Sequence, residues 1–286
     1  MKLKLVKTVI GKHKLVCNYL PEDRYIGQRI ALGKYEPYLS RLMLEQIKEG
    51  DVVIDVGANI GYYSMLFSKK VGEKGKIYAF EPDKTNYEIL VKNIRENKLK
   101  NVKVIKGALG SKNSIKTMFK SADNLGDHRL FSDKLAISGY EKIKVYKLDS
   151  YLKRQKENRK IDLIKIDTQG WEPEVMLGAK KTIEKFRPTI FFEYWPWAYK
   201  MAGLNKTKMM AFLRKIYGQI NFIEEYIQVY FPIKTGKLDQ QFADNNEKLY
   251  GNLWVKGEID WKYWKGSVKD FWLKKMMKRI LGKPQT

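Results

Sequence analysis

The stretch GDVVIDVGANIGYYSMLFSKKVGEKGKIYAFEPDKTNYEILVKNIREN, residues 50–97, decides the fold of this chain of 286 residues. Val52 to Val56 is a continuous apolar and β-branched run that carries Asp55 near its end. Such a run is typical of a parallel strand covered on both faces. A helix over 62–70, a second strand over 76–80 and a helix over 85–97 follow. This order predicts one half of a nucleotide-binding α/β sheet.

A glycine turn joins the first strand to its helix. Gly57 and Gly61 allow the backbone to turn sharply and bring bare amides and a helix N-terminus close to a ligand. Glu81 ends the second strand, where its carboxylate can accept hydrogen bonds from both hydroxyls of a ribose. We therefore expect the turn and the strand end to bind a cofactor through Gly57, Ala58, Asn59, Gly61, Tyr62, Glu81 and Pro82.

Asp55 distinguishes between two kinds of cofactor. A pyrophosphate-binding turn has the pattern G-x-G-x-x-G, whereas this turn is Gly57-x-x-x-Gly61, and a carboxylate in front of it repels a pyrophosphate. S-adenosylmethionine carries an amine and a sulfonium, which a carboxylate attracts. The turn therefore favours S-adenosylmethionine, with Asp55 near its methionyl end. The alternative is that Asp55 and Glu81 only accept hydrogen bonds from local backbone amides.

Further strands alternate with helices along the chain. A strand over 101–106 ends at Gly107 and Ala108, which we expect to face the same pocket, and strands over 161–166 and 189–193 follow. The pattern predicts a doubly wound, mostly parallel sheet with helices on both faces. Residues 115–119 and 143–148 indicate a peripheral strand pair. We also expect one continuous helix over 174–185, irregular structure over 19–33, and Tyr87, Leu90, Val91 and Ile94 on the inward face of helix 85–97.

A second group of polar residues follows the strand over 161–166. Strand alternation places Lys165 and Asp167 on one side of the sheet, and a buried lysine needs a carboxylate partner. Glu172 and Glu193 emerge at the same edge. Methyl transfer to a hydroxyl requires a base, and Asp167 or His128 is the candidate. We therefore expect the catalytic group to be Asp167, His128, Lys165, Glu172 and Glu193, while their separation in sequence gives no support for a metal site.

Aromatic residues follow the strand over 189–193. Tyr194, Trp195 and Trp197 could stack on a sugar or a base, whereas aromatic residues after a core strand also simply pack. The sequence leaves both interpretations open.

Composition sets limits on the setting of the protein. The single cysteine, Cys17, excludes an internal disulfide, and residues 1–16 lack the continuous apolar centre of a signal peptide. We therefore expect a cytoplasmic protein. The net charge of +24 favours an anionic partner such as nucleic acid, anionic lipid or acidic glycan, although interspersed lysines also describe a generally basic surface. The sequence leaves the oligomeric state open.

The two ends of the chain differ from its centre. We expect a strand flap over 1–35, a catalytic domain over 36–257 and a basic aromatic tail over 258–286. Within the tail, residues 270–282 form a basic amphipathic helical pattern. Such a helix either docks on the sheet or, with the tryptophans near it, contacts an anionic membrane surface peripherally through 261–282.

Two separated motifs carry a family resemblance. VIDVGANIGYYSMLF with YAFEPDKTNYEILVKNI, and DLIKIDTQGWEPEVMLGAKKTI with RPTIFFEY, resemble the FkbM family of S-adenosylmethionine-dependent methyltransferases over about residues 36–194. The resemblance implies a Rossmann-like class I methyltransferase fold, S-adenosylmethionine as donor and O-methylation of a sugar or natural-product hydroxyl. Carried onto matching positions, it implies cofactor binding by Asp55, Gly57, Asn59, Gly61, Glu81 and Ala108, with Asp167 and Glu172 near the reaction.

Three functions therefore follow from the sequence. The first is O-methylation of a hydroxyl of a glycan, glycolipid or secondary metabolite. The second is methylation of ribose hydroxyls in RNA, which the basic charge favours. The sequence has no Pro-Pro motif of amino-directed nucleic-acid methyltransferases, which disfavours methylation of a base amine. The third is a non-catalytic Rossmann-like protein that binds an anionic polymer or membrane.

Overall fold

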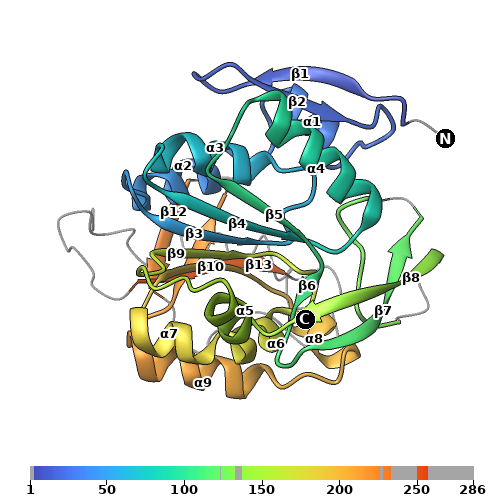
Figure 1. Cartoon of the computed structure of the whole chain (residues 1–286). Coiled ribbons are helices and arrows are strands. Elements are labelled where there is room, and N and C mark those ends of the chain that lie inside the picture. The colour runs from blue at the N-terminus through green and yellow to red at the C-terminus, as the bar shows by residue number, and fades with distance from the viewer. Residues whose placement is uncertain (1–2, 123, 133–136, 226–227, 233–249, 257–286) are drawn as a thin grey trace, which may run out of the picture.

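The computed structural model describes residues 3–122, 124–132, 137–225, 228–232 and 250–256. Within them, an eight-stranded sheet forms the centre of the molecule (Figure 1). Its strands, in spatial order, are β12 (Val229–Pro232), β11 (Asn221–Glu224), β13 (Gly251–Val255), β10 (Thr189–Tyr194), β9 (Leu163–Ile166), β3 (Val52–Val56), β4 (Lys76–Glu81) and β5 (Val102–Lys106).

The centre of the sheet is parallel and its outer end is antiparallel. Strands β5, β4, β3, β9 and β10 run parallel, whereas β13 pairs antiparallel with both β10 and β11. The chain moves outward from β3 to β5 and then returns to the other side of β3 to form β9. The strand order therefore reverses between β3 and β9, and ligands of doubly wound sheets bind beyond the carboxyl ends of strands at such a point. This confirms the predicted fold class.

Helices cover both faces of the sheet, as Figure 1 shows. One face carries α2 (Pro37–Gln46), α3 (Tyr62–Val71) and α4 (Lys84–Glu96), and the other carries α5 (Leu148–Arg154), α6 (Glu172–Gly178), α7 (Lys180–Phe186) and α9 (Lys206–Tyr217). Successive residues of β3 enter different cores: Ile54 packs with the second group of helices, and Val53 packs with the first. Both faces are thus apolar, which explains the uninterrupted hydrophobic run in this strand.

An N-terminal hairpin packs against α4. It consists of β1 (Val6–Ile10) and β2 (Leu15–Tyr19) and is followed by a short helix, α1 (Gly27–Ala31), where the sequence pattern indicates irregular structure. Asn93 of α4 is fully buried and exchanges hydrogen bonds with Asn18 of β2. Leu90 and Ile94 of α4 are buried as predicted, but the inward face is rotated toward Asn93, so that Val91 is exposed. Tyr87 is half-buried rather than part of the core.

A smaller sheet lies beside the carboxyl edge. The predicted peripheral pair is present as β7 (Ser114–Ser121) and β8 (Ile137–Tyr146), which are antiparallel, and β6 (Ala108–Leu109) joins it in parallel with β8. Residues 124–132 lie in the connection between β7 and β8. Several of them line the cavity that is described below.

The predicted helix over 174–185 is broken into two. It divides at Ala179 into α6 and α7, and a further helix, α8 (Pro196–Met201), follows β10. Gly178 explains the tight packing at the break, because a Cβ atom there would lie 2.0 Å from the carbonyl oxygen of Gly110. The tail 258–286, with the amphipathic pattern 270–282 and the expected membrane contact through 261–282, lies outside the described residues. Among the helices that are described, none combines the length and apolar character needed to cross a bilayer.

Candidate active site

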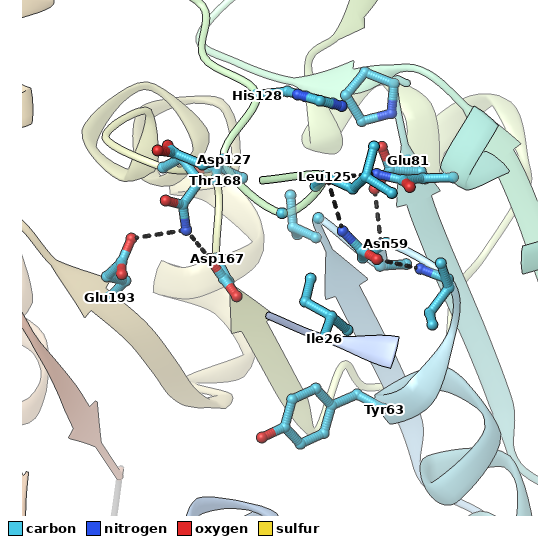
Figure 2. A pocket seen from close by; sticks show the side chains of 18 of the residues that line it. Ile26, Asn59, Tyr63, Glu81, Leu125, Asp127, His128, Asp167, Thr168 and Glu193 are labelled. Carbon is cyan, nitrogen blue, oxygen red and sulfur yellow. Dashed lines mark hydrogen bonds between the residues drawn. The ribbon is translucent and has the colours of Figure 1, made fainter. Parts of the chain in front are cut away.

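A cavity of about 310 Å³ opens at the carboxyl edge of the sheet, beyond β3, β4, β9 and β10. The turn after β3 and the end of β4 form one part of its wall, and the residues after β9 and at the end of β10 form another. Segments that precede α2 and that connect β7 to β8 complete the lining. In Figure 2, Glu81 and Asn59 lie on one side of this space, and Asp167 and Glu193 lie on the other.

The glycine turn brings backbone atoms very close together. Gly57 has a φ of +73°, and a Cβ atom there would lie 1.9 Å from the carbonyl oxygen of Asp167. Asn59 also adopts the left-handed conformation, with a φ of 50°, and its side-chain oxygen accepts a hydrogen bond of 2.7 Å from the amide of Ile60. Asparagine tolerates this conformation better than most residues. The two left-handed residues therefore turn the backbone sharply at the cavity wall.

Glu81 is fixed by two backbone amides. Its carboxylate oxygens accept hydrogen bonds of 2.8 Å from the amides of Asn59 and Asp83. The side chain lines the cavity although the residue is buried. Burial raises the pKa of Glu81 to about 8, and the two amide hydrogen bonds only partly oppose this effect. Each oxygen retains a lone pair for a further donor, such as a sugar hydroxyl.

Lys165 of β9 lies at the centre of a charged group. Its Nζ atom is 3.6 Å from both Asp55 Oδ1 and Asp167 Oδ2 and donates a 3.0 Å hydrogen bond to the carbonyl oxygen of Gly57. Burial alone lowers the pKa of Lys165, but Asp167 and Asp55 outweigh it, so the pKa is raised. Asp55 is fully buried and also accepts a 2.6 Å hydrogen bond from Ser64. The sequence predicts a carboxylate partner for Lys165, and the structure has two, Asp55 and Asp167.

Gln169 bridges two carboxylates on one wall of the cavity. Its amide nitrogen donates to Asp167 Oδ1 at 2.8 Å and to Glu193 Oε2 at 3.2 Å, as dashed lines show in Figure 2. Gln169 and Gly170 both have positive φ, 53° and 93°. Burial, followed by the proximity of Asp167, holds the pKa of Glu193 well above its ordinary value. Gln169 thus holds Asp167 and Glu193 together on one wall, with Lys165 against the other oxygen of Asp167.

Glu172 supports the wall from behind. It is fully buried at the start of α6, and its Oε1 atom accepts hydrogen bonds of 2.8 Å from both the amide and the hydroxyl of Thr168. Burial raises its pKa to about 7. Glu172 therefore orients the segment that follows β9, and it is Thr168 that faces the cavity.

His128 lies apart from the other residues of the expected catalytic group. Its Nδ1 atom accepts a hydrogen bond of 3.2 Å from the amide of Ser121, and its Nε2 atom is 3.8 Å from Asp83 Oδ2. Burial lowers the pKa of His128. Figure 2 shows the imidazole above Glu81, on the side away from Glu193. His128 therefore lines the cavity but is not brought together with Asp167.

Glu36 is the most informative residue that sequence reasoning did not include in the site. It adopts a left-handed conformation (φ 41°) just before Pro37 and accepts a 2.7 Å hydrogen bond from the hydroxyl of Tyr63. Burial, followed by the proximity of Asp167, raises its pKa to about 7. A residue before proline ordinarily favours extended backbone, so no local signal indicates this position. Such strain is concentrated at functional sites.

Asp127, Trp195 and Tyr250 also line the cavity, although the predicted site does not include them. Asp127 lies in the polar connection between β7 and β8. The unusual length of this connection is the signal in the sequence that could have indicated a functional segment. Trp195 is one of the aromatic residues whose role the sequence leaves open. Trp195 directly follows β10 and Tyr250 directly precedes β13, so their proximity depends on how these two strands pair. Sheet pairing of this kind is not readable from one sequence.

Most of the predicted residues share the cavity wall, and four do not. The lining includes Gly57, Ala58, Asn59, Tyr62, Glu81, Pro82, Ala108, His128, Lys165, Asp167 and Glu193. The residues behind it are Asp55, Gly61, Gly107 and Glu172. In the part of the chain that the structure covers, no group of three or more acidic, histidine or cysteine residues is arranged to hold a metal ion.

The chemistry of the lining fits S-adenosylmethionine. Glu81 offers acceptors for two hydroxyls, and the turn at Gly57 leaves room for a ligand against the backbone. Carboxylates predominate at the far end, around Asp167 and Glu193, where they suit an ammonium and a sulfonium. A doubly wound sheet with this turn, this terminal acid and a cavity at the reversal of strand order defines the class I methyltransferase fold.

Comparison with known proteins identifies the family. The model of the methyltransferase FkbM domain matches residues 55–231, more than half of the chain. The chain therefore belongs to the FkbM methyltransferase family.

Individual relatives match shorter parts of the chain at moderate or low identity. A probable cobalt-precorrin-6B C(15)-methyltransferase (decarboxylating) of Sulfurisphaera tokodaii is 34% identical over 89 residues, 31% of this chain and 46% of the relative. The hexuronic acid methyltransferase AglP of Haloferax volcanii is 28% identical over 144 residues, 50% of this chain and 56% of the relative. The chain thus spans about half the length of these curated relatives. The crystal structure of an FkbM methyltransferase from Methylobacillus flagellatus is similar at a TM-score of 0.36 and 18% identity, covering 52% of this chain and 33% of that one.

Proposed function

We propose that this protein transfers a methyl group from S-adenosylmethionine to a hydroxyl of a sugar, in a glycan, a glycolipid or a glycosylated metabolite. The observation that carries the proposal is the arrangement of acids along one cavity. Glu81 lies where the lining suits a ribose, and Asp167 and Glu193 lie across the cavity from it. Family membership supports the methyl transfer, and the cavity supports the oxygen acceptor.

The cofactor would be held by three parts of the wall. Glu81 would accept hydrogen bonds from the ribose hydroxyls, and Ala108 and Pro82 would flank the adenosine. The amides around Gly57 would approach the methionyl part. Asp55 is fully buried behind the wall, so it would act through Lys165 and Ser64 rather than by direct contact.

The chemistry requires a base near the acceptor hydroxyl. S-adenosylmethionine supplies an electrophilic methyl carbon and leaves as S-adenosylhomocysteine when its S–CH₃ bond breaks. Asp167 would accept the hydroxyl proton as the new O–CH₃ bond forms. Lys165 and Gln169 support this role, because their contacts with both Asp167 oxygens fix the carboxylate in one orientation. Glu193, on the same wall, would hydrogen-bond to another hydroxyl of the acceptor.

A sugar is favoured as acceptor by two independent observations. The cavity carries the aromatic rings of Trp195 and Tyr250 together with several carboxylates. A sugar can pack its C–H face on the rings and donate hydrogen bonds from its hydroxyls to the carboxylates. The relative AglP is named as a hexuronic acid methyltransferase, so a sugar acceptor occurs among similar proteins. The name of AglP describes a carboxylate-bearing sugar, and only the general class of sugar acceptors is carried over to this chain.

Calorimetry and isotope transfer test the proposal. We expect S-adenosylmethionine to bind the wild type and to bind Glu81→Gln about tenfold or more weakly, because one of the two acceptor oxygens at the ribose position becomes an NH₂ group. Glu88→Gln, in the exposed Lys84 and Glu88 pair on α4, is the matched control and should bind normally. Tritiated methyl groups should then enter a glycan fraction of cell extract and remain there after mild alkali, since methyl ethers survive alkali and methyl esters do not. Absence of cofactor binding, or label lost to alkali, would contradict the proposal.

A further inference from the structure

The cavity end that contains Asp167 is rich in carboxylates from four separate parts of the chain. They belong to Glu36 before α2, Asp127 in the β7 to β8 connection, Asp167 after β9 and Glu193 on β10. Each of the other three carboxylates contributes to raising the pKa of Glu193, after the larger effect of burial. The four groups therefore lie close enough to influence one another. Distant segments have converged on an acidic pocket.

Two cations at this end are already compensated by carboxylates. Lys165 has Asp55 and Asp167 at 3.6 Å. Arg129 is buried and donates two hydrogen bonds to Asp127, from Nε to Oδ1 at 2.7 Å and from Nη2 to Oδ2 at 2.6 Å. An incoming carboxylate or phosphate would thus meet Lys165 and Arg129 only where carboxylates already contact them, and like charges a few ångströms apart repel strongly in a partly buried site.

Aromatic rings form the other boundary of this pocket. The guanidinium of Arg129 lies 4.8 Å from the ring centre of Trp195, which holds that ring in place. Tyr250 is 60% exposed, lines the same cavity and lies 5.9 Å from Trp195 between ring centres. An exposed ring at the opening of a cavity offers an apolar surface to a ligand.

We propose that Asp127, Glu193, Trp195 and Tyr250 form the acceptor subsite, and that it accepts uncharged or amino-bearing sugars and rejects sugars that carry a carboxylate or phosphate. The proposal rests on the sugar methylation proposed above and narrows its substrate class by charge. Aromatic rings pack against the sugar face, while the carboxylates accept hydrogen bonds from hydroxyl or ammonium groups. Asp127 has a second role, because its pairing with Arg129 keeps that cation from attracting an anionic sugar.

Binding to the cofactor-loaded protein tests the proposal without requiring turnover. The protein is first titrated with S-adenosylhomocysteine by calorimetry, and the saturated complex is then examined by saturation-transfer NMR. The probes are the methyl glycosides of glucose, galactose and mannose, each beside its 2-amino derivative and its uronic acid. We expect at least one uncharged or amino-bearing sugar to bind, and its uronic acid to bind about tenfold or more weakly.

Substitutions at Asp127 and Tyr250, with a control at Tyr140, make the test specific. Asp127→Asn removes a carboxylate that compensates Arg129, so the affinity for the uronic acid should rise about tenfold relative to the uncharged sugar. Tyr250→Ala should weaken binding of the uncharged sugar and Tyr250→Phe should restore it, whereas Tyr140→Ala, at an exposed tyrosine on β8 away from the cavity, should have no effect.

The outcomes separate the two proposals. Failure of S-adenosylhomocysteine to bind would contradict the proposed function. A second outcome is that S-adenosylhomocysteine binds, but a uronic acid binds as tightly as its uncharged counterpart or no uncharged or amino-bearing sugar binds. In that case the proposed charge selectivity is wrong, while the proposed methyl transfer stands.

Discussion

Asp55 on β3 and Lys165 on β9 are direct partners across the two strands between which the strand order reverses. Their charged atoms are 3.6 Å apart, and both side chains are almost completely buried. The same lysine reaches Asp167 at the end of its own strand and the carbonyl oxygen of Gly57 in the turn after β3. One cation thus connects the glycine turn to the acidic end of the cavity.

Replacing Lys165 with methionine should therefore damage both stability and binding. Removing one partner of a buried ion pair leaves the other charge unpaired, at a cost of about 3–5 kcal/mol in the free energy of unfolding. Urea unfolding would measure this loss. Lys180→Met is the matched control, because its pair with Glu184 is half-exposed on α7 and should contribute less than about 1 kcal/mol. Equal effects of the two substitutions would show that Lys165 does not hold the strands together.

Gly57→Ala should prevent the close approach of the turn to the strand end. The added Cβ would lie 1.9 Å from the carbonyl oxygen of Asp167, so the backbone must move. Gly33→Ala is the control, since Gly33 also has positive φ (+67°) but has open space around it. The control should lose about 1–2 kcal/mol from left-handed strain alone, and Gly57→Ala should lose about 1–3 kcal/mol more. Calorimetry should also show that only Gly57→Ala loses cofactor affinity.

The central strands and the buried ion pair could be predicted because each follows from a local rule. Residues 52–56 are apolar apart from Asp55, so the sequence predicts β3 with the bounds that the structure has. Lys165 interrupts a strand that must be buried, and the cost of an unpaired buried charge is enough to require a carboxylate partner. Glu81 is likewise placed by the end of β4.

The remaining part of the site depends on contacts between distant segments. Glu36 meets Tyr63 only because α2 packs against α3, and its left-handed backbone contradicts the local preference of a residue before proline. Asp127 and Glu193 come together through the path of the β7 to β8 connection across the sheet edge. Apolar periodicity also misplaced the inward face of α4, because it gives no weight to a buried asparagine such as Asn93.

Asn93→Ala should test whether this asparagine couples the N-terminal hairpin to the glycine turn. Its side chain exchanges hydrogen bonds with Asn18 and donates a 2.8 Å bond to the carbonyl oxygen of Ile60. Leaving these buried groups unsatisfied should cost about 3 kcal/mol in the free energy of unfolding and weaken cofactor binding. Val91→Ala, on the exposed side of the same helix, should remain within about 0.5 kcal/mol of the wild type. If Val91→Ala lowered the free energy of unfolding more than Asn93→Ala does, the inward face of α4 would be the one that apolar periodicity predicts.

Glu81 should make the stability of the ligand-free protein depend on pH in an unusual direction. Its pKa is raised from 4.5 to about 8, so between these values the native state binds more protons than the unfolded state. Stability contributed by the protonated group is therefore present below pH 4.5 and is lost as the pH rises through about 8. Asp83 and Glu157, whose pKa values are lowered, act below this window.

The difference between wild type and Glu81→Gln isolates this contribution from all other titrating groups. The side chain at position 81 of the variant is uncharged at every pH. The thermal midpoint of the variant, relative to that of the wild type, should therefore rise by several degrees between about pH 5 and pH 8.5. Scanning calorimetry at constant ionic strength would measure both proteins, with Glu88→Gln as an exposed glutamate that should follow the wild type throughout. If the midpoint of Glu81→Gln relative to that of the wild type stays constant or falls with rising pH, the carboxyl group is already ionised in the native protein. In that case the ribose site would be charged at neutral pH before any cofactor binds.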